Sequence, residues 1–310
     1  MNLNKITIQG LVLIVFSIVT STKSNAQQDP QYTQYMYNTM SVNPAYAGQR
    51  NVLSVAALYR MQWVGIDGAP RSLTFGAHQP LKNERIGLGL NIVSDEIGPT
   101  KETTFDINAS YSIPVNRDGL ELSFGLKAGV HFLDTDWSKG NLLQQIDPLF
   151  TDNINLITPT LGAGLYLHSD KWYLGGAVPN IITTKHYDDF KESIATERLH
   201  MFLIGGYVFD LSDNTKLKPA FLVKAVSGAP LIADVSANFL FNEKLNLGLA
   251  WRWDDSVSVL AGFQINKDLF IGYAYDLTTT NLNNYNSGTH EIMLRYEFQK
   301  VVKILSPRFF

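Results

Sequence analysis

The sequence predicts an all-β protein, namely a transmembrane, antiparallel, up-and-down β-barrel of about fourteen strands. Three observations lead to this fold class. Apolar and polar residues alternate along stretches of roughly ten residues, turn residues separate these stretches, and long connections follow only some of them, at odd-numbered positions. Successive side chains of a strand point to opposite faces. A barrel in a bilayer therefore needs an apolar outer face and a small or polar inner face.

The composition limits the function classes but does not choose between a membrane barrel and a soluble protein. The formal net charge is -3 over 310 residues, which favours neither nucleic acid nor an acidic surface as a partner. The chain has no cysteine, so disulfide scaffolds, thiolate metal sites and cysteine nucleophiles are excluded. Beyond the N-terminus, no apolar run approaches the roughly 20 residues that a spanning helix needs.

Residues 1–26 are predicted to be a cleaved secretory signal peptide. Lys5 gives a positively charged start, Leu11–Val19 is an apolar core, and Ser24-Asn25-Ala26 supplies the small residues of a cleavage site. The mature chain would then begin at Gln27. The alternative is an N-terminal membrane anchor, for which this core is short and wrongly flanked.

Residues 27–50 differ from the rest of the chain because they are dense in tyrosine and amide side chains. The stretch Asp29–Asn38 is expected to contain a short helix, with Tyr32, Tyr35 and Met36 on one face. Its initial Asp-Pro pair suits a helix cap followed by a first helical residue.

The second half of this segment, Asn43-Pro44-Ala45-Tyr46-Ala47-Gly48, is a turn sequence, because proline fixes its own φ and restricts the residue before it. Two interpretations of residues 27–50 stay open. The segment either folds into the barrel mouth or lumen and plugs it, or it is a periplasmic lead-in that packs locally. Its many tyrosines favour a buried, hydrogen-bonded segment over a free tail.

Residues 51–298 are predicted to form the barrel wall. The last strand shows the alternation most clearly, with Ile292, Leu294, Tyr296 and Phe298 on one face and Glu291, Met293, Arg295 and Glu297 on the other. The predicted strands are Val52–Trp63, Arg71–Gln79, Arg85–Ser94, Glu102–Ile113, Leu120–Leu133, Ile157–His168, Lys171–Pro179, Thr196–Asp210, Thr215–Val226, Leu231–Phe241, Lys244–Trp253, Ser256–Asn266, Asp268–Leu277 and Thr289–Phe298.

Two kinds of connection separate the predicted strands. Tight polar turns such as Asn116–Gly119 and Asn266–Asp268 are typical of hairpins. The long connections are 134–156, 180–195 and 278–288, and they follow the fifth, seventh and thirteenth predicted strands. In outer-membrane barrels the short turns face the periplasm and the long loops face outside. Long connections after odd-numbered strands therefore fit a barrel whose first strand starts in the periplasm.

Charged side chains are expected inside the barrel, because each charge on the lipid face near the midplane costs about 2–4 kcal/mol. These inward charges could line a pore, or they could pair across strands and close it. They include Glu121, Lys127, Arg252, Glu291, Arg295 and Glu297. The same alternation would also build a soluble β-sandwich with its apolar face inward. The signal peptide, the strand number and the loop positions together favour the barrel.

No residue pattern points to an enzyme, a cofactor or a metal ion. The six histidines form no HxxxH or HxH pair, and without cysteine there is no strong zinc pattern. No G-x-S-x-G motif is present. Gly87-Leu88-Gly89-Leu90-Asn91 lacks the setting of a phosphate loop and fits a glycine-rich strand. The acidic pairs Asp188-Asp189 and Asp254-Asp255 fit solvated loops better than calcium sites.

Short motifs are spread over the whole mature chain. They are Asp29-Pro30-Gln31-Tyr32-Thr33-Gln34-Tyr35-Met36-Tyr37-Asn38, Asn43-Pro44-Ala45-Tyr46-Ala47-Gly48, Trp63 with Gly68-Ala69-Pro70-Arg71-Ser72, His290-Glu291-Ile292-Met293-Leu294-Arg295-Tyr296-Glu297-Phe298, and Ser306-Pro307-Arg308-Phe309-Phe310. In combination they resemble the PorP/SprF family, outer-membrane proteins of the type IX secretion system of Bacteroidetes. Phe309 departs from the tyrosine expected there. Residues 299–310 would be a C-terminal tail, serving as an assembly signal or a periplasmic contact.

The resemblance implies a non-enzymatic outer-membrane barrel of the secretion and gliding machinery, anchoring or escorting a secreted or surface-attached partner. The implied partners are outer-membrane lipid and either the periplasmic ring proteins, a large secreted adhesin, or both. Aromatic and amide groups supply contact area and hydrogen bonds, so the candidate partner-binding residues are Tyr32, Tyr35, Asn38, Asn43, Pro44, Tyr46 and Gly48. One alternative is a porin or FadL-like outer-membrane solute transporter with an N-terminal plug. Another is a soluble, secreted, lectin-like sandwich.

Overall fold

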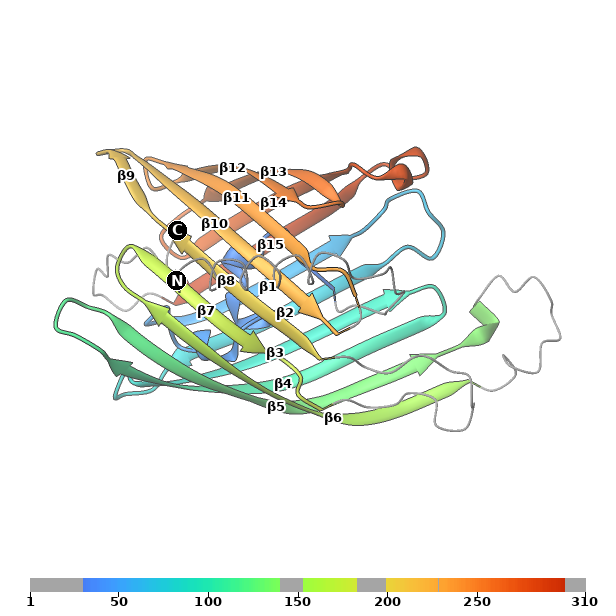
Figure 1. Ribbon diagram of the computed structural model, residues 1–310, viewed down its shortest axis with the longest axis horizontal. Coiled ribbons are helices and arrows are strands. Elements are labelled where there is room, and N and C mark those ends of the chain that lie inside the picture. The colour runs from blue at the N-terminus through green and yellow to red at the C-terminus, as the bar shows by residue number, and fades with distance from the viewer. Residues whose placement is uncertain (1–29, 140–152, 183–198, 228, 299–310) are drawn as a thin grey trace, which may run out of the picture.

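The computed structural model describes residues 30–139, 153–182, 199–227 and 229–298 (Figure 1). The predicted signal peptide and the predicted C-terminal tail lie outside the described residues. Over these ranges, no helix is long and apolar enough to cross a bilayer.

The described chain contains fifteen strand segments. Their bounds are β1 Leu53–Met61, β2 Arg71–Pro80, β3 Ile86–Ile97, β4 Thr100–Pro114, β5 Glu121–Thr135, β6 Ile154–His168, β7 Trp172–Val178, β8 His200–Tyr207, β9 Phe209–Ser212, β10 Thr215–Val226, β11 Ile232–Phe241, β12 Leu245–Arg252, β13 Ser256–Gln264, β14 Leu269–Thr278 and β15 Thr289–Phe298. Both β8 and β9 pair with β10, so they are two parts of one strand of the wall. The wall therefore has fourteen strands, as the alternation predicts.

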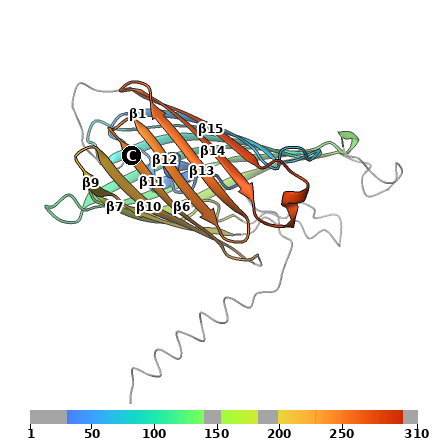
Figure 2. The same ribbon diagram turned by 90° about the horizontal axis from the view of Figure 1, so that it is seen from above.

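The strands form one antiparallel sheet that closes on itself. Each strand pairs with its neighbours in the chain, and β1 also pairs with β15 over its whole length, from Leu53↔Phe298 to Met61↔His290. Figure 2 shows this seam, with β15 lying between β14 and β1. The predicted fold class, a closed antiparallel barrel, is confirmed.

The outer face is apolar and the inner face is polar. On β15, Ile292 and Leu294 are 44% and 47% exposed, whereas Glu291 and Arg295 are 0% and 4% exposed. Leu126 and Leu249 on other strands are exposed in the same way. Because side chains alternate along a strand, the exposed apolar residues form the face that a bilayer would cover.

The two ends of the barrel differ in their connections. At one end, which we call the tight-turn end, residues 81–85, 115–120, 169–171, 213–214, 242–244 and 265–268 make short connections. At the other end, the loop end, the connections 136–153, 179–199 and 279–288 are long. Because β8 and β9 count as one strand of the wall, these connections follow its fifth, seventh and thirteenth strands, and the predicted pattern of long loops is confirmed. In outer-membrane barrels the tight turns face the periplasm and the long loops face outside, so the same orientation stays the prediction for this barrel.

Candidate functional site

The candidate site is the segment 30–50, which we call the lumen segment. It runs inside the barrel and appears in blue behind β7 and β8 in Figure 1. Nearly all of its residues are buried. It starts near the loop end, where Thr33 contacts β14 and β15, and it finishes near the tight-turn end, where Arg50 contacts β15. The segment therefore passes along the barrel axis before the chain enters β1.

Single turns of 3-10 helix shape the lumen segment. They are η1 Tyr35–Tyr37, η2 Thr39–Ser41 and η3 Pro44–Tyr46. The short helix expected in the first half is therefore a pair of 3-10 turns. Local side-chain bonds compete with a continuous helix, and the Ser41 hydroxyl donates to the Asn38 carbonyl at 2.7 Å. Asp29, the expected cap, lies outside the described residues.

Asn43 fixes the second half of the segment. Its backbone is extended, with φ -141° and ψ 110°, as the following Pro44 requires. Its side-chain oxygen accepts a hydrogen bond from the Ala45 N–H at 3.0 Å and so caps η3. Its side-chain nitrogen donates to the Leu165 carbonyl at 2.9 Å, which ties the turn to β6. One amide thus shapes the turn and attaches it to the wall.

A buried carboxylate holds the segment at the loop end. The two oxygens of Glu291 accept hydrogen bonds from the backbone N–H groups of Thr33 at 2.7 Å and Gln34 at 3.0 Å. Arg60, directly opposite on β1, pairs with Glu291 and lies 2.8 Å from Asp276 of β14. The Thr33 hydroxyl also donates to Asp276 at 2.8 Å. Because an unpartnered buried charge is costly, segment and wall stabilise each other.

A second arginine extends this cluster. Arg252 lies 3.1 Å from Asp234 and 3.1 Å from Asp255, and it donates to the Thr33 hydroxyl at 3.3 Å. We call the whole group the loop-end anchor; its charged members are Arg60, Arg252, Asp234, Asp255, Asp276 and Glu291. Within the part of the chain that the structure describes, no group of three histidine or carboxylate side chains is placed to hold a metal ion.

A second ion-pair cluster holds the segment near the tight-turn end. Arg50 donates to Glu297 of β15, and Arg295 lies 3.2 Å from the same carboxylate. The Gly48 N–H donates to His78 Nδ1 at 3.1 Å. Glu297 is six residues beyond Glu291 on the same strand, or roughly 20 Å at 3.4 Å per residue. The segment is therefore fixed at two well-separated heights.

Glycines in the wall let the segment lie directly against the backbone of β5 and β6. A Cβ atom at Gly125 would stand 2.1 Å from the Ala45 nitrogen, and one at Gly164 would stand 2.2 Å from the Asn43 side-chain oxygen. Both positions therefore require glycine for this close approach. The turn at Asn43–Tyr46 is therefore in direct contact with the backbone of β5 and β6.

The tyrosines of the segment pack against aromatic residues of the wall. Tyr46 meets Tyr166 edge-on, with ring centroids 5.4 Å apart. Tyr37 lies 5.2 Å from Phe270 and accepts a hydrogen bond from the side chain of Asn246. Such contacts supply buried area and orient the rings. The tyrosine-rich sequence is thus explained by packing inside the barrel.

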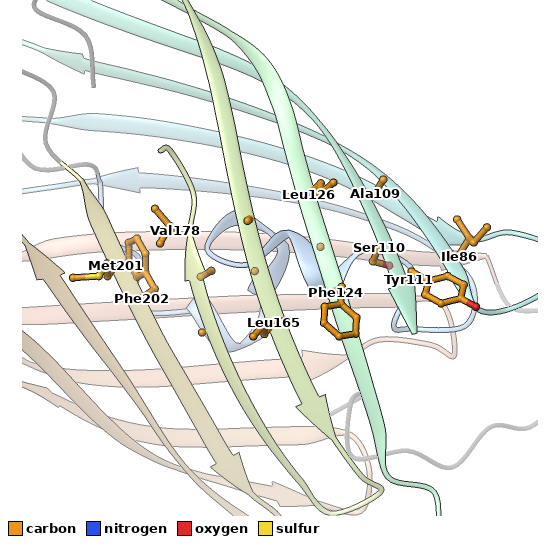
Figure 3. A pocket seen from close by; sticks show the side chains of 15 residues that line it. Ile86, Ala109, Ser110, Tyr111, Phe124, Leu126, Leu165, Val178, Met201 and Phe202 are labelled. Carbon is orange, nitrogen blue, oxygen red and sulfur yellow. The ribbon is translucent and has the colours of Figure 1, made fainter. Parts of the chain in front are cut away.

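The structure has one hollow beside the segment and another on the outer face of the wall. A polar one of about 120 Å³ lies near the tight-turn end and includes Gln49 and Glu84. An apolar one of about 790 Å³ lies on the outer face over β3 to β8 and is lined by outward-facing side chains such as Leu126, Leu165 and Met201 (Figure 3). Because it is on the outer face of the wall, it is no solute path through the lumen.

The comparisons with known proteins identify the family. A family model described as the type IX secretion system membrane protein PorP/SprF matches residues 24–296. The chain belongs to the PorP/SprF family. Among curated proteins none matches the chain. As a PorP/SprF member with a barrel fold of the outer-membrane kind, the protein is a membrane component associated with type IX secretion, and both properties support the outer membrane as its location.

Solved structures are similar to this PorP/SprF member in fold. The toluene transporter TbuX of Ralstonia pickettii is 11% identical, with a TM-score of 0.50 over 84% of this chain and 93% of that chain. The outer membrane protein Omp33 of Acinetobacter baumannii is 9% identical, with a TM-score of 0.48 over 80% of this chain and 98% of that chain. At 11% identity, the likeness to TbuX shows the barrel fold alone.

All the predicted partner-binding residues of this PorP/SprF member lie in the lumen segment. They are Tyr32, Tyr35, Asn38, Asn43, Pro44, Tyr46 and Gly48, and each is buried. The structure thus brings them together, facing the inner wall and not the outside. Their role toward a partner stays a prediction, because a partner could touch them only if the segment left the lumen.

Sequence reasoning missed four residues around Glu291: two that donate backbone N–H groups to it, and two that belong to its ion-pair network. Thr33 and Gln34 contribute backbone N–H groups, which carry no side-chain signal. Arg60 and Asp276 do carry one, because both fall on the inward face of their strands, where a charge needs a partner. The open question of a charged pore or paired charges is answered for these residues by pairing.

Proposed function

We propose that this protein is a non-conducting outer-membrane barrel that anchors or escorts a secreted or surface-attached partner of the type IX secretion system. The observation that carries the proposal is the lumen segment, which is buried, held at the loop end by hydrogen bonds to Glu291 and held at the tight-turn end by the ion pair of Arg50 with Glu297. A solute channel needs an open path, whereas an anchor needs a rigid wall with surfaces at its two ends. The segment suits the second role.

Membership of the PorP/SprF family supports a partner within the secretion machinery. A barrel with its loop end outside and its tight-turn end in the periplasm offers a surface to each compartment. The proposed partners are a large secreted adhesin at the loop end and periplasmic ring proteins at the tight-turn end. A link to gliding is part of the same proposal.

In this proposal, the buried tyrosine and amide residues act indirectly, because they hold the lumen segment in place. Replacing Tyr32, Tyr35 and Asn43 together with alanine should abolish co-purification of the partner while the barrel still assembles. Assembly is measured by the slower migration of the heated protein in detergent gels. Normal co-purification by the triple variant would refute a role for these residues.

The decisive experiment compares the supernatant and cell-surface proteins of a deletion strain with those of its parent. Loss of many secreted proteins at once would identify a core secretion component, and loss of one large surface protein would identify a dedicated escort. An unchanged profile would contradict the proposal and place solute transport first.

Planar-bilayer recording separates the proposal from the transport alternative. The full-length protein should give no steady current, because the anchored segment occupies the lumen. Steady currents of solute-channel size would favour a porin or FadL-like transporter.

A further inference from the structure

Among the residues that the structure describes, the outer half of β6 has an edge without a partner strand. β6 pairs with β5 along its whole length, but it pairs with β7 only over Ala163–His168. β7 ends at Val178, while β6 continues toward the loop end as far as Ile154. Within the described ranges, no strand pairs with residues 154–160 on the side away from β5. A sheet edge of this kind presents free backbone groups.

The hydrogen bond between Ile181 and Leu161 shows in which direction the backbone groups of the β6 edge point. The Leu161 carbonyl accepts a hydrogen bond from the Ile181 N–H at 2.6 Å, so Leu161 directs its backbone groups away from β5. Residues of an antiparallel strand bond alternately to its two sides. Pro159, Ile157 and Asn155 therefore direct their backbone groups to the same open side. Asn155 and Ile157 offer an N–H and a C=O each, and Pro159 offers a C=O only.

The open edge lies where the apolar band of the wall ends. Lys101, Asp134 and Asn155 are paired in register across β4, β5 and β6, and all three are exposed, so they form a polar row. One step toward the tight-turn end, Ile157 is 69% exposed and lies opposite the exposed Phe132. The edge thus crosses the outer boundary of the lipid-covered face, on the side that faces out of the cell.

We propose that the edge Asn155–Pro159 is a docking site for one extended strand of the exported partner, which adds to the wall by backbone hydrogen bonds. The identity of the partner rests on the proposed function. A row of unpaired N–H and C=O groups recognises another extended backbone. The added strand would carry apolar side chains beside Ile157 and polar ones beside Asn155. Pro159 lacks a donor, which limits the pairing to the outer boundary of the membrane.

A second copy of this chain is a poorer occupant of the same edge. It would bring its own Pro159 to the interface, so a donor would be missing on both sides. A partner strand without proline at that point satisfies every group that the edge offers. The occupant is therefore an exported chain and not another barrel.

A matched pair of substitutions tests the backbone contact. Because the Ile157 N–H points to the open side, Ile157→Pro leaves the β5–β6 ladder intact and removes one donor, as Pro159 does already. Ile157→Ala keeps the donor and removes only the side chain. In a deletion strain complemented with each variant, Ile157→Pro should lower the surface amount of the partner about tenfold, through the lost bond and the clash of the ring. Ile157→Ala should stay within about twofold of the wild type.

Barrel assembly of both variants is checked by heat-dependent migration in gels. If Ile157→Pro assembles and restores the partner fully, the inference is overturned while the proposed function stands. If the deletion strain shows no change in any secreted or surface protein, the proposed function is wrong, and the inference that rests on it is wrong as well. A parallel fall in both variants would indicate a side-chain contact and would overturn strand addition.

Cross-linking identifies the occupant directly. The chain has no cysteine, so Ile157→Cys provides a single attachment point for a thiol-directed photo-cross-linker on intact cells. An adduct with an exported protein is the expected result. An adduct with a second copy, or with residues 183–198 of the same chain, would overturn the proposal.

Discussion

At the scale of single residues, Glu291 is the carboxylate that joins the lumen segment to the barrel seam. It is 0% exposed and satisfies two segment N–H groups as well as Arg60. Glu291→Gln should lower the free energy of unfolding by about 3 kcal/mol, the low end for a broken buried pair, because Asp276 still neutralises Arg60. Urea titration of the reconstituted protein, followed by tryptophan fluorescence, measures the change.

The control for this substitution is an ion pair on the surface. Lys171 and Asp210 lie 2.9 Å apart and are exposed. Asp210→Asn should leave the urea midpoint unchanged, because exposed pairs are screened by water. Equal midpoints for Glu291→Gln and the wild type would show that the loop-end anchor does not hold the segment.

Two glycines of one wall region test the close approach of η3. A Cβ at Gly125 would meet the Ala45 nitrogen at 2.1 Å, whereas a Cβ at Gly176 has its nearest neighbour at 4.0 Å. Gly125→Ala should therefore displace η3 and speed hydrogen exchange of residues 43–48, and Gly176→Ala should not. Exchange followed by mass spectrometry gives both rates. Equal protection in the two variants would contradict the contact between η3 and the wall.

At the scale of elements, the lumen segment sets the direction in which the chain enters the barrel. Thr33 is held at the loop end, and the predicted mature terminus, Gln27, precedes Pro30 by three residues, at most roughly 11 Å of chain. The N-terminus should therefore be accessible from outside the cell. Gln28→Cys should react with a membrane-impermeant maleimide on intact cells.

Two further cysteine variants give this experiment its reference points. Asn283→Cys, in the connection between β14 and β15, should react on intact cells, and Asp118→Cys, in the tight turn between β4 and β5, should react only after the outer membrane is opened. Labelling of Gln28→Cys that follows the Asp118 pattern would show that the N-terminus faces the periplasm.

The strands could be predicted from sequence because their signal is local. Alternation placed Glu291 and Arg295 inside and Ile292 outside, and turn residues set the bounds of each strand. The 3-10 turns could not be predicted, because their shape depends on contacts with the wall, such as the bond from Asn43 to Leu165. The open edge of β6 was also out of reach, since an edge is a property of neighbouring strands.

At the scale of the whole molecule, the lumen segment decides whether the barrel conducts. Deleting residues 31–47 should convert a silent barrel into one with steady current in planar bilayers, because the wall closes through β1 and β15 without the segment. The full-length protein, prepared in the same way, is the control. A deletion variant that assembles and stays silent would show that something other than this segment closes the lumen.

Glu291 and Glu297, the carboxylates that hold the two ends of the lumen segment, both lie on β15, the strand that closes the barrel against β1. Until β15 docks, Glu291 and Glu297 can stay hydrated; once it docks, each must find its partners or remain a buried charge. The wall can close without the segment, but water must then replace the partners of both carboxylates. Biogenesis should therefore proceed in a preferred order, with the segment in place before the final seam forms, and a chain with a faulty segment should close its seam more slowly than the wild type.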